Sequence, residues 1–411
     1  MERYGLLGEK LSHSLSPLVH SKLCSVPYDL FEKSPDGAED FIRNGDFAGI
    51  NVTIPYKVTA CCLCDVLSPE AERIGAVNTV VRRGDTLYGY NTDYFGFIYS
   101  VRRSGADVAG KKCLVLGSGG ASKAVTAALR DLGAGEIKVI SRSGEDNYGN
   151  LSRHRDARVI VNATPLGMYP NCGVSPVDLN TFPDVEFVYD LIFNPMKTKL
   201  LLDAERLGIP SDGGLRMLVA QAKKSSDLFL GVERDDGVIE EICLAVRRMA
   251  LNVILVGMPG SGKTRVGKLV AEATGKRFVD SDEEIVRWEG RPIPEIFEKE
   301  GEGYFRRVES EVIRDICRET GLVVATGGGC VTVEENRDPM LQNGMIVRLD
   351  RDVSKLAKRG RPLSLGGDLR VMLEKRAPLY DSFSDFTVKN ETSPQNAARE
   401  IISLLERYVK K

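Results

Sequence analysis

The stretch LNVILVGMPGSGKT, at residues 251–264, decides the fold of the second half of the chain. Its first six residues form an apolar run typical of a strand, and its last eight fit the phosphate-loop template G-x-x-x-x-G-K-[ST]. A helix-like pattern follows at 265–274. In this strand–loop–helix setting, glycines let backbone N–H groups surround phosphates at a helix N-terminus. Lys263 is expected to reach the β- and γ-phosphates, and Thr264 to hold Mg²⁺. The predicted ATP contacts are Gly257, Pro259, Gly260, Ser261, Gly262, Lys263 and Thr264.

A second glycine loop of another kind lies far upstream. GSGGASKA, at 117–124, follows the strand-like KKCLVL of 111–116 and opens a helix-like stretch at 121–132. Its glycines are close together and no Lys-Thr pair ends it, which is typical of loops that let a dinucleotide's pyrophosphate approach the backbone. The chain is therefore expected to bind two different nucleotide cofactors.

The length and composition of the chain indicate its number of domains and argue against nucleic-acid-binding and membrane proteins. The 411 residues suffice for two or three domains, and 42% of them are hydrophobic and 28% charged. A net charge of −2 gives no sign of the excess positive charge that binding to nucleic acid or to an anionic membrane requires. No apolar run reaches the roughly 18 residues of a membrane span, and MERYGLLGEK reads as a strand rather than a targeting peptide. Nine scattered cysteines predict reduced thiols and a cytoplasmic location.

Neither cysteine nor histidine predicts a metal centre. A C-x-x-C spacing occurs in a helix-like stretch at 58–67, where core packing is the better explanation for Cys61, Cys62 and Cys64. The histidines are too few and too dispersed for a zinc site: His13, His20 and His154.

Strand-like and helix-like segments alternate over almost the whole chain, which predicts α/β architecture with mostly parallel sheets. The expected domains are 1–93 together with 213–249, then 94–212, then 250–411. No Pro-, Gly- or Ser-rich linker separates the helical segment at 237–249 from the strand at 251, so the two halves are expected to be joined almost rigidly.

Several segments of the first half carry a dense set of hydroxyl, amide, ammonium and carboxylate groups, which suits a small polyhydroxy acid. They are HSLSP (13–17), NVTIPYK (51–57), GAVNT (75–79) and GYNTD (89–93). With GSGGASKA, VNATPLGM (161–168) and GGLRMLVAQA (213–222), they follow the order seen in shikimate dehydrogenases, which residues 1–248 resemble. The resemblance implies a two-lobed dehydrogenase with a Rossmann-like NADP domain that reduces 3-dehydroshikimate to shikimate with NADPH.

The resemblance also implies roles for single residues. Ser14 and Ser16 are implied to bind the substrate carboxylate. The implied substrate contacts are Ser14, Ser16, Asn51, Thr53, Lys57, Asn78, Asp93 and Gln221. The implied NADP contacts are Gly117, Ser118, Gly119, Gly120, Ala121, Ser141, Arg142, Ser143, Thr164 and Gly214.

Lys57 and Asp93 are the implied catalytic pair. Hydride delivery to a ketone leaves an alkoxide that must take up a proton. A lysine beside the carbonyl oxygen can polarise it and supply that proton, while a carboxylate orients the ammonium. Taken alone, Lys57 is better explained as a solvated surface lysine; its place among seven ordered motifs favours catalysis.

The choice between NAD and NADP rests on Ser141-Arg142-Ser143, after the second strand of the nucleotide unit. NAD sites generally have an acidic residue there, whereas an arginine between two hydroxyls suits the 2′-phosphate of NADP. The family's usual sequence at this point is Asn-Arg-Thr. Two other departures are Lys10, where the family usually has proline, and Phe193, where a substrate-facing tyrosine is common.

The second half carries a further ordered set of motifs. FVDSD (278–282) ends a strand with two acids on the same side; FRRVE (305–309), GGG (327–329), GRPL (360–363) and KRAPLY (375–380) follow. Together they resemble shikimate kinase, a P-loop kinase with a parallel sheet, over about 251–411. The resemblance implies that Asp280 holds Mg²⁺ through water and that Asp282 orients or deprotonates the accepting hydroxyl. The implied shikimate contacts are Asp282, Arg306, Gly328 and Arg376, and Arg361 is implied to belong to a lid over the phosphates.

The two resemblances reinforce each other, because the product of the first reaction is the acceptor of the second. The sequence therefore predicts a bifunctional enzyme that uses NADPH, ATP and Mg²⁺. Two alternatives stay open: a quinate/shikimate dehydrogenase fused to a small-polyol kinase, and a ligand-sensing regulator with dead catalytic sites. The regulator is disfavoured because Lys57, Asp93, Lys263 and Asp282 are all present. The sequence does not predict an oligomeric state.

Overall fold

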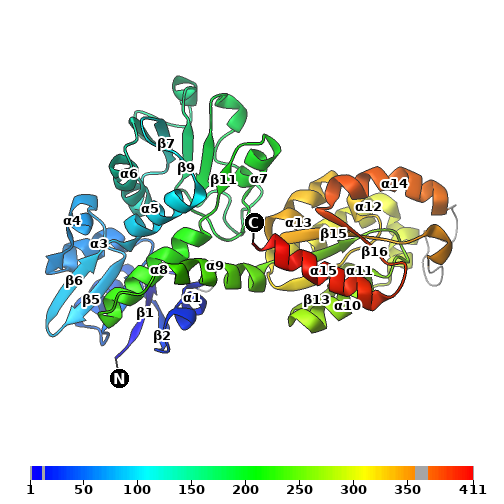
Figure 1. Cartoon of the computed structure of the whole chain (residues 1–411), viewed down its shortest axis with the longest axis horizontal. Coiled ribbons are helices and arrows are strands. Elements are labelled where there is room, and N and C mark those ends of the chain that lie inside the picture. The colour runs from blue at the N-terminus through cyan, green and yellow to red at the C-terminus, as the bar shows by residue number, and fades with distance from the viewer. Residues whose placement is uncertain (1, 12–13, 357–368, 411) are drawn as a thin grey trace. The chain divides into compact units, whose positions relative to one another are not determined.

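The computed structural model describes residues 2–11, 14–356 and 369–410. The chain divides into two compact units, Met1–Cys243 and Leu244–Lys411, and each combines sheets with covering helices (Figure 1). Two residues named above lie outside the described ranges, His13 and the predicted lid residue Arg361. No helix in the described ranges is long and apolar enough to cross a membrane.

The first sheet of unit 1 has the strand order β2-β1-β3-β5-β6-β4. Its strands are β1 (Tyr4–Gly8), β2 (Tyr28–Glu32), β3 (Gly49–Val52), β4 (Val66–Leu67), β5 (Thr79–Arg83) and β6 (Thr86–Tyr90). β1 pairs in parallel with β2 and β3, but β5 pairs antiparallel with both β3 and β6. With the parallel β4–β6 pair, three of the five strand pairs are parallel, so the expectation of mostly parallel sheets holds here with an antiparallel insertion at β5. Gly84 makes the tight β5–β6 turn with φ +61°, a conformation that glycine adopts without a steric penalty.

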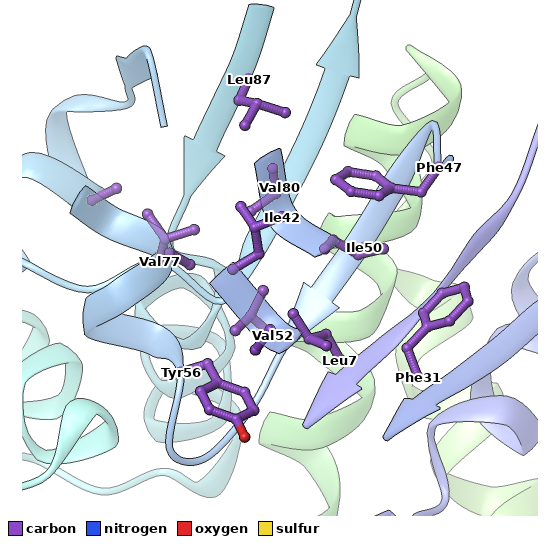
Figure 2. Packing of buried hydrophobic residues seen from close by; sticks show 13 residues of the cluster. Leu7, Phe31, Ile42, Phe47, Ile50, Val52, Tyr56, Val77, Val80 and Leu87 are labelled. Atoms are coloured by element: carbon purple, nitrogen blue, oxygen red, sulfur yellow. The ribbon is translucent and has the colours of Figure 1, made fainter. Parts of the chain in front are cut away.

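One face of this sheet carries the core that places the first half's motifs. Figure 2 shows Ile42, Val52 and Val80 gathered at its centre, with Leu7 beside Val52. Tyr56 closes the cluster at the end of β3, and its hydroxyl donates to the carbonyl of Lys33 at 2.6 Å. Because Tyr56 directly precedes Lys57, the core fixes where that lysine leaves the sheet.

The helices of unit 1 surround both of its sheets. They are α1 (Ser16–Leu23), α2 (Pro35–Asn44), α3 (Lys57–Leu63), α4 (Pro69–Ile74), α5 (Thr92–Ser104), α6 (Gly120–Asp131), α7 (Lys199–Arg206), α8 (Leu215–Leu230) and α9 (Gly237–Ala250), which continues into unit 2. Extensive contacts join α5 to α8 and α5 to α6 (Figure 1). All nine cysteines are free, and Cys61 and Cys64 pack against the core of Figure 2. Cys62 is exposed, so the expected buried face is wrong for that residue.

The second sheet of unit 1 is fully parallel, in the order β11-β10-β9-β7-β8. Its strands are β7 (Lys112–Leu116), β8 (Glu136–Ile140), β9 (Val159–Asn162), β10 (Phe187–Asp190) and β11 (Ser211–Asp212). The strand order reverses at β7, and ligands of open α/β sheets bind beyond the carboxyl ends of strands at such a point. The GSGGASKA loop follows β7 directly, as the Rossmann-like prediction requires.

Unit 2 contains a parallel sheet in the order β13-β14-β12-β15-β16. Its strands are β12 (Asn252–Val256), β13 (Arg277–Asp280), β14 (Leu322–Ala325), β15 (Gly344–Asp350) and β16 (Phe386–Lys389). Its helices are α10 (Lys263–Thr274), α11 (Ser281–Glu289), α12 (Ile293–Arg318), α13 (Arg337–Asn343), α14 (Leu369–Phe383) and α15 (Pro394–Tyr408). The central strand is β12, at which the strand order reverses. The phosphate loop that follows it therefore lies at the carboxyl end of the sheet.

The end of α9 is held by unit 2. The half-buried Lys276 donates to the carbonyls of Arg248, Met249 and Leu251 at 2.8, 3.0 and 2.8 Å. Burial lowers the pKa of Lys276 to about 8. Arg248 also pairs with Glu406. The division between the compact units accordingly falls within α9, before the junction at 249/250 expected from the sequence.

We predict that a fragment 250–411 is less stable than a fragment 244–411, by about 1–3 kcal/mol. The shorter fragment removes two of the three carbonyls that Lys276 contacts and leaves its amine buried without them. Urea unfolding of the two fragments, followed by far-UV circular dichroism, measures the difference. Identical unfolding midpoints would show that the end of α9 adds nothing to the kinase unit.

Candidate active sites

A buried ion pair joins two of the predicted motifs in unit 1. Lys57 is the first residue of α3 and Asp93 the second residue of α5, and Lys57 Nζ lies 2.6 Å from Asp93 Oδ2. The two side chains are only 15% and 9% exposed, so their attraction is screened less than at a surface. The N-terminus of α5 also favours the anionic carboxylate. The structure thus brings the predicted catalytic pair together as a charged, oriented unit.

The amide of Asn78 contacts the other oxygen of that carboxylate. Asn78 Nδ2 donates to Asp93 Oδ1 at 3.0 Å, and Asn78 Oδ1 accepts from the backbone N–H of Thr92 at 2.7 Å. Gln221, on α8, places its Oε1 3.4 Å from both Asn78 Nδ2 and Thr92 Oγ1. Three predicted substrate residues, from separate parts of the sequence, therefore form one cluster: Asn78, Asp93 and Gln221.

Asn51 lies beneath this cluster. Its Oδ1 accepts from Tyr28 Oη at 2.8 Å, and its Nδ2 donates to Ser225 Oγ at 2.7 Å and Thr79 Oγ1 at 3.1 Å. Both N–H groups of Asn51 are thus directed at protein oxygens, although the sequence predicts that this side chain binds substrate. Sequence reasoning missed Tyr28 and Ser225. Ser225 stands one helical turn after Gln221, and that i+4 spacing was an available signal.

The other predicted substrate residues lie at element ends. Ser14 Oγ accepts from the backbone N–H of Ser16, the first residue of α1, at 3.2 Å. Thr53 follows β3, and its N–H donates to the carbonyl of Leu7 at 2.9 Å. These contacts hold the two hydroxyl-bearing turns in place, with Thr53 directly beyond the carboxyl end of β3.

The glycine loop after β7 lies next to the lysine. Gly117 has φ +104°, and a Cβ there would be 3.0 Å from Cγ2 of Thr164, another predicted NADP contact. A Cβ on Gly120 would meet the Lys57 side chain at 3.3 Å. Gly214 could not carry a Cβ, because it would overlap the carbonyl of Leu191. Close backbone approach therefore sets the predicted cofactor loop beside the catalytic pair.

The buried carboxyl group of Asp190 is linked to Thr164 through the side chain of Asn162. Asn162 Oδ1 accepts from Thr164 Oγ1 at 2.7 Å, and Asn162 Nδ2 donates to Asp190 Oδ1 at 3.0 Å. Thr198 Oγ1 donates to Asp190 Oδ2 at 2.6 Å. Burial raises the pKa of Asp190 to about 6, although these donors oppose the shift. The sequence did not predict the network of Asp190 and Thr198, because nothing distinguishes these two residues from ordinary strand and loop residues.

In unit 2 the phosphate loop has the close contacts that its template requires. Gly257, Gly260 and Gly262 have φ values of +140°, +87° and +101°, a region favouring glycine. Lys263 Nζ donates to the carbonyls of Gly257 and Met258 at 2.7 and 3.0 Å, so it lies across the loop. Ser261 is fully buried, and its carbonyl accepts from Asn390 Nδ2 at 2.8 Å.

Two oxygen-bearing side chains that suit a magnesium ion, Thr264 and Asp280, lie at the end of this loop. Thr264 Oγ1 donates to Asp280 Oδ2 at 2.9 Å, and Asp280 Oδ1 accepts from the backbone N–H of Asp282 at 3.1 Å. A hydroxyl and a carboxylate at this separation fit Mg²⁺, which binds nucleotide sites through one or two such groups plus phosphates and water. The two residues predicted to hold the metal, Thr264 and Asp280, therefore lie together.

The glycine run 327–329 is the point on which the acceptor residues converge. A Cβ on Gly327 would lie 2.9 Å from Asp282 Oδ1 and 2.6 Å from Glu309 Oε1, and a Cβ on Gly329 would overlap the Arg306 guanidinium. Arg306 Nη1 donates to Glu309 Oε2 at 2.6 Å. Glu309 is fully buried, and burial raises its carboxyl pKa, with Arg306 opposing the shift. Glu309 ends the predicted FRRVE motif, but the sequence alone gave it no role of its own.

Gly328 links the acceptor side to the phosphate loop. Its carbonyl accepts from Arg376 Nη1 at 3.1 Å and from the buried Tyr380 Oη at 2.5 Å. A Cβ on Gly328 would lie 2.6 Å from Pro259 of the phosphate loop. The predicted shikimate contacts Asp282, Arg306, Gly328 and Arg376 thus surround one loop.

Fold and sites together define an α/β enzyme with an oxidoreductase part of the two-lobed, dinucleotide-linked class and a P-loop kinase part. Sequence profiles agree: the shikimate dehydrogenase substrate binding domain matches residues 6–80, and shikimate kinase matches residues 259–406. A shikimate dehydrogenase (NADP(+)) of Clostridium perfringens strain SM101 is 35% identical over 263 residues, which cover 59% of this chain and 97% of the relative. The chain therefore belongs to the shikimate dehydrogenase family and carries a shikimate kinase domain, and both parts are enzymes of the shikimate pathway.

Solved structures resemble the first part in the same way. Shikimate dehydrogenase 1 from Peptoclostridium difficile matches with a TM-score of 0.56 and 39% identity, covering 59% of this chain and 96% of that one. A chorismate mutase/shikimate 5-dehydrogenase fusion protein from Clostridium acetobutylicum matches with a TM-score of 0.56, 36% identity and the same coverage. Shikimate 5-dehydrogenase from Thermus thermophilus, in complex with NADP(H) and shikimate, matches with a TM-score of 0.54 and 33% identity, covering 59% and 98%.

We predict that Gly328→Ala lowers the kinase kcat/KM by about a hundredfold, because a shift of about 1 Å at such a loop misplaces the reacting groups. Gly303→Ala, in α12, is the matched control, since a Cβ there meets nothing within 4 Å. Steady-state kinase rates of the two full-length variants measure the effect. Equal, undiminished rates for both would mean that Gly328 does not set the acceptor site.

Proposed function

We propose that the chain catalyses two consecutive steps: NADPH-dependent reduction of 3-dehydroshikimate to shikimate, then ATP-dependent phosphorylation of shikimate to shikimate 3-phosphate. The observation that carries the proposal is the Lys57–Asp93 pair beside Gly120 of the glycine loop in one unit, with Asp282 beside the glycine run 327–329 that abuts the phosphate loop in the other. We further propose the three domains 1–93 with 213–249, 94–212 and 250–411, and a cytoplasmic location.

In the dehydrogenase step, NADPH supplies the hydride when it is bound over the loop at 117–121. Lys57 donates a hydrogen bond to the ketone oxygen and then its proton to the alkoxide that forms. Asp93 keeps the ammonium oriented and accepts from a neighbouring substrate hydroxyl. Asn78 and Gln221 direct amide groups at the remaining hydroxyls. Ser14 and Ser16 bind the substrate carboxylate, and Asn51 and Thr53 bind hydroxyl groups of its ring.

Cofactor choice in this proposal rests on the segment after β8. Arg142 is exposed and pairs with the 2′-phosphate, with Ser141 and Ser143 adding hydrogen bonds. Ser118, Gly119 and Ala121 present backbone N–H groups of the loop and helix start, where anions are favoured. Thr164, which lies beside Gly117, and Gly214 would also contact the bound cofactor.

In the kinase step, the loop from Gly257 to Thr264 binds the phosphates and Asp282 orients or deprotonates the 3-hydroxyl of shikimate. Arg306 and Arg376 pair with the shikimate carboxylate, and Glu309 keeps Arg306 in place. Mg²⁺, held by Thr264 and through water by Asp280, supplies charge neutralisation between the phosphates when bound. Arg361 is proposed to close over the phosphates from outside the described ranges.

A coupled assay tests the whole proposal. The full-length protein is supplied with 3-dehydroshikimate, NADPH, ATP and Mg²⁺, and the products are identified by mass spectrometry. Shikimate 3-phosphate forms only when all four are present, and shikimate accumulates when ATP is left out. Turnover of quinate-type acids, or phosphorylation of another polyol in preference to shikimate, would support the quinate/shikimate alternative instead.

Lys57→Ala is expected to lower the dehydrogenase kcat by at least about a hundredfold, the usual contribution of a positioned general acid. Because Lys57 contributes to the reaction more than to ground-state binding, KM for 3-dehydroshikimate should change little. Kinase activity of the same variant is the control for folding. A dehydrogenase kcat close to the parent's would place the proton donor elsewhere.

Asp282→Asn is expected to abolish phosphoryl transfer while ATP still binds, because transfer depends on a positioned acceptor as well as on the held nucleotide. Lys263→Met should weaken nucleotide binding itself. Equilibrium titration with a fluorescent ATP analogue, together with kinase rates, separates the two effects. Loss of nucleotide binding in Asp282→Asn would contradict the role given to that carboxylate.

A further inference from the structure

The segment that carries Arg142 is a compact loop closed by its own hydrogen bonds. We call residues 141–150, between β8 and the short helix η1 (Leu151–His154), the cofactor loop. Asn147 Nδ2 donates to the carbonyl of Gly144 at 3.1 Å, and Asn150 Nδ2 donates to the carbonyl of Glu145 at 2.8 Å. Such a loop keeps one shape, so whatever anchors it also places Arg142.

A buried histidine anchors this loop. His154 is 4% exposed, and its Nε2 lies 2.9 Å from Asp146 Oδ1. Because a carboxylate only accepts, Nε2 carries the hydrogen. The same Asp146 accepts at its backbone carbonyl from the N–H of Ser141 at 3.2 Å. A single residue thus connects the buried histidine to the first residue of the Ser141-Arg142-Ser143 segment.

The anchored residue, Asp146, is acidic, and it lies in the loop after β8, where an acidic residue affects the choice between NAD and NADP. In dinucleotide sites a carboxylate after the second strand binds the ribose hydroxyls of NAD. Here the Asp146 carboxylate is turned toward His154, and Lys138 Nζ lies 3.7 Å from its other oxygen. Released from these partners, it would compete with a 2′-phosphate for Arg142, four residues earlier in the same loop.

We propose that His154 is a positioning and specificity-determining residue of the dehydrogenase: by holding Asp146 it fixes Ser141 and Arg142 for a 2′-phosphate and keeps a carboxylate away from it. The inference rests on the NADPH assignment proposed above. His154 touches neither the cofactor nor the substrate, so its effect is on the preference between cofactors and not on the chemical step.

The test compares kcat and KM for NADPH and NADH in full-length variants. His154→Ala should raise KM for NADPH roughly tenfold, the scale of one charge-assisted contact, with kcat unchanged and KM for NADH unchanged or lower. His154→Gln keeps an N–H donor at similar reach and should restore most of the NADPH preference. Ser152→Ala, exposed in the same helical turn, is the matched control, and kinase activity reports that each chain is folded.

Arg142→Ala separates this inference from the assignment on which it rests. If Arg142→Ala erases the NADPH preference while His154→Ala leaves it intact, the role of His154 is overturned and the cofactor assignment stands. If Arg142→Ala leaves the preference intact, both are overturned. Equal increases in KM for the two cofactors in His154→Ala, without recovery in His154→Gln, would reduce His154 to a structural role and overturn the proposal.

Discussion

Close approach of the backbone to a neighbouring group, possible only where glycine stands, is the constraint on which both active sites depend. Gly120 lets the start of α6 lie against Lys57, and Gly328 lets the acceptor loop lie against Pro259 of the phosphate loop. In each unit the glycine joins the part that holds a nucleotide to the part that holds the acceptor. A methyl group at Gly328 would overlap Pro259, and one at Gly120 would lie 3.3 Å from the Lys57 side chain, which would have to shift by a few tenths of an ångström.

In unit 1, buried polar groups behind the Lys57 site pair with one another. Asn51, Thr79 and Ser225 bind one another beneath the Asp93 cluster, and Asp190 accepts three donors beneath Thr164. Burying such groups without partners costs roughly 1–3 kcal/mol each. Satisfied networks of this kind favour one arrangement, so the proposed catalytic pair, Lys57 and Asp93, is held in a fixed orientation.

Local signals in the sequence predicted local structure well. The phosphate loop, the second glycine loop, α6, α8 and α10 follow from motifs and from turn or helix patterns, because the chain within about ten residues determines them. The β5–β6 hairpin was missed, although Gly84-Asp85 marked its turn, and Cys62 proved exposed. Tyr28 was missed, and Glu309 and Tyr380 were recognised only as motif members without a role. Their roles come from contacts 23 to 52 residues away or from burial that the sequence does not display. The family resemblance supplied the pairing of Lys57 with Asp93; spacing alone did not.

Every residue that holds the Lys57–Asp93 cluster comes from Met1–Cys243, and every residue that surrounds the glycine run 327–329 comes from Leu244–Lys411. Each described site is therefore assembled within one compact unit, as independently folding domains allow. The covalent link between the units is α9, a single helix whose last turn is clamped by Lys276. All residues in these hydrogen bonds belong to unit 2, so the end of α9 is part of the kinase unit and does not depend on unit 1 for its position. Within residues 2–11, 14–356 and 369–410, the two candidate sites thus share no residue, and the connector's final turn is part of the kinase unit.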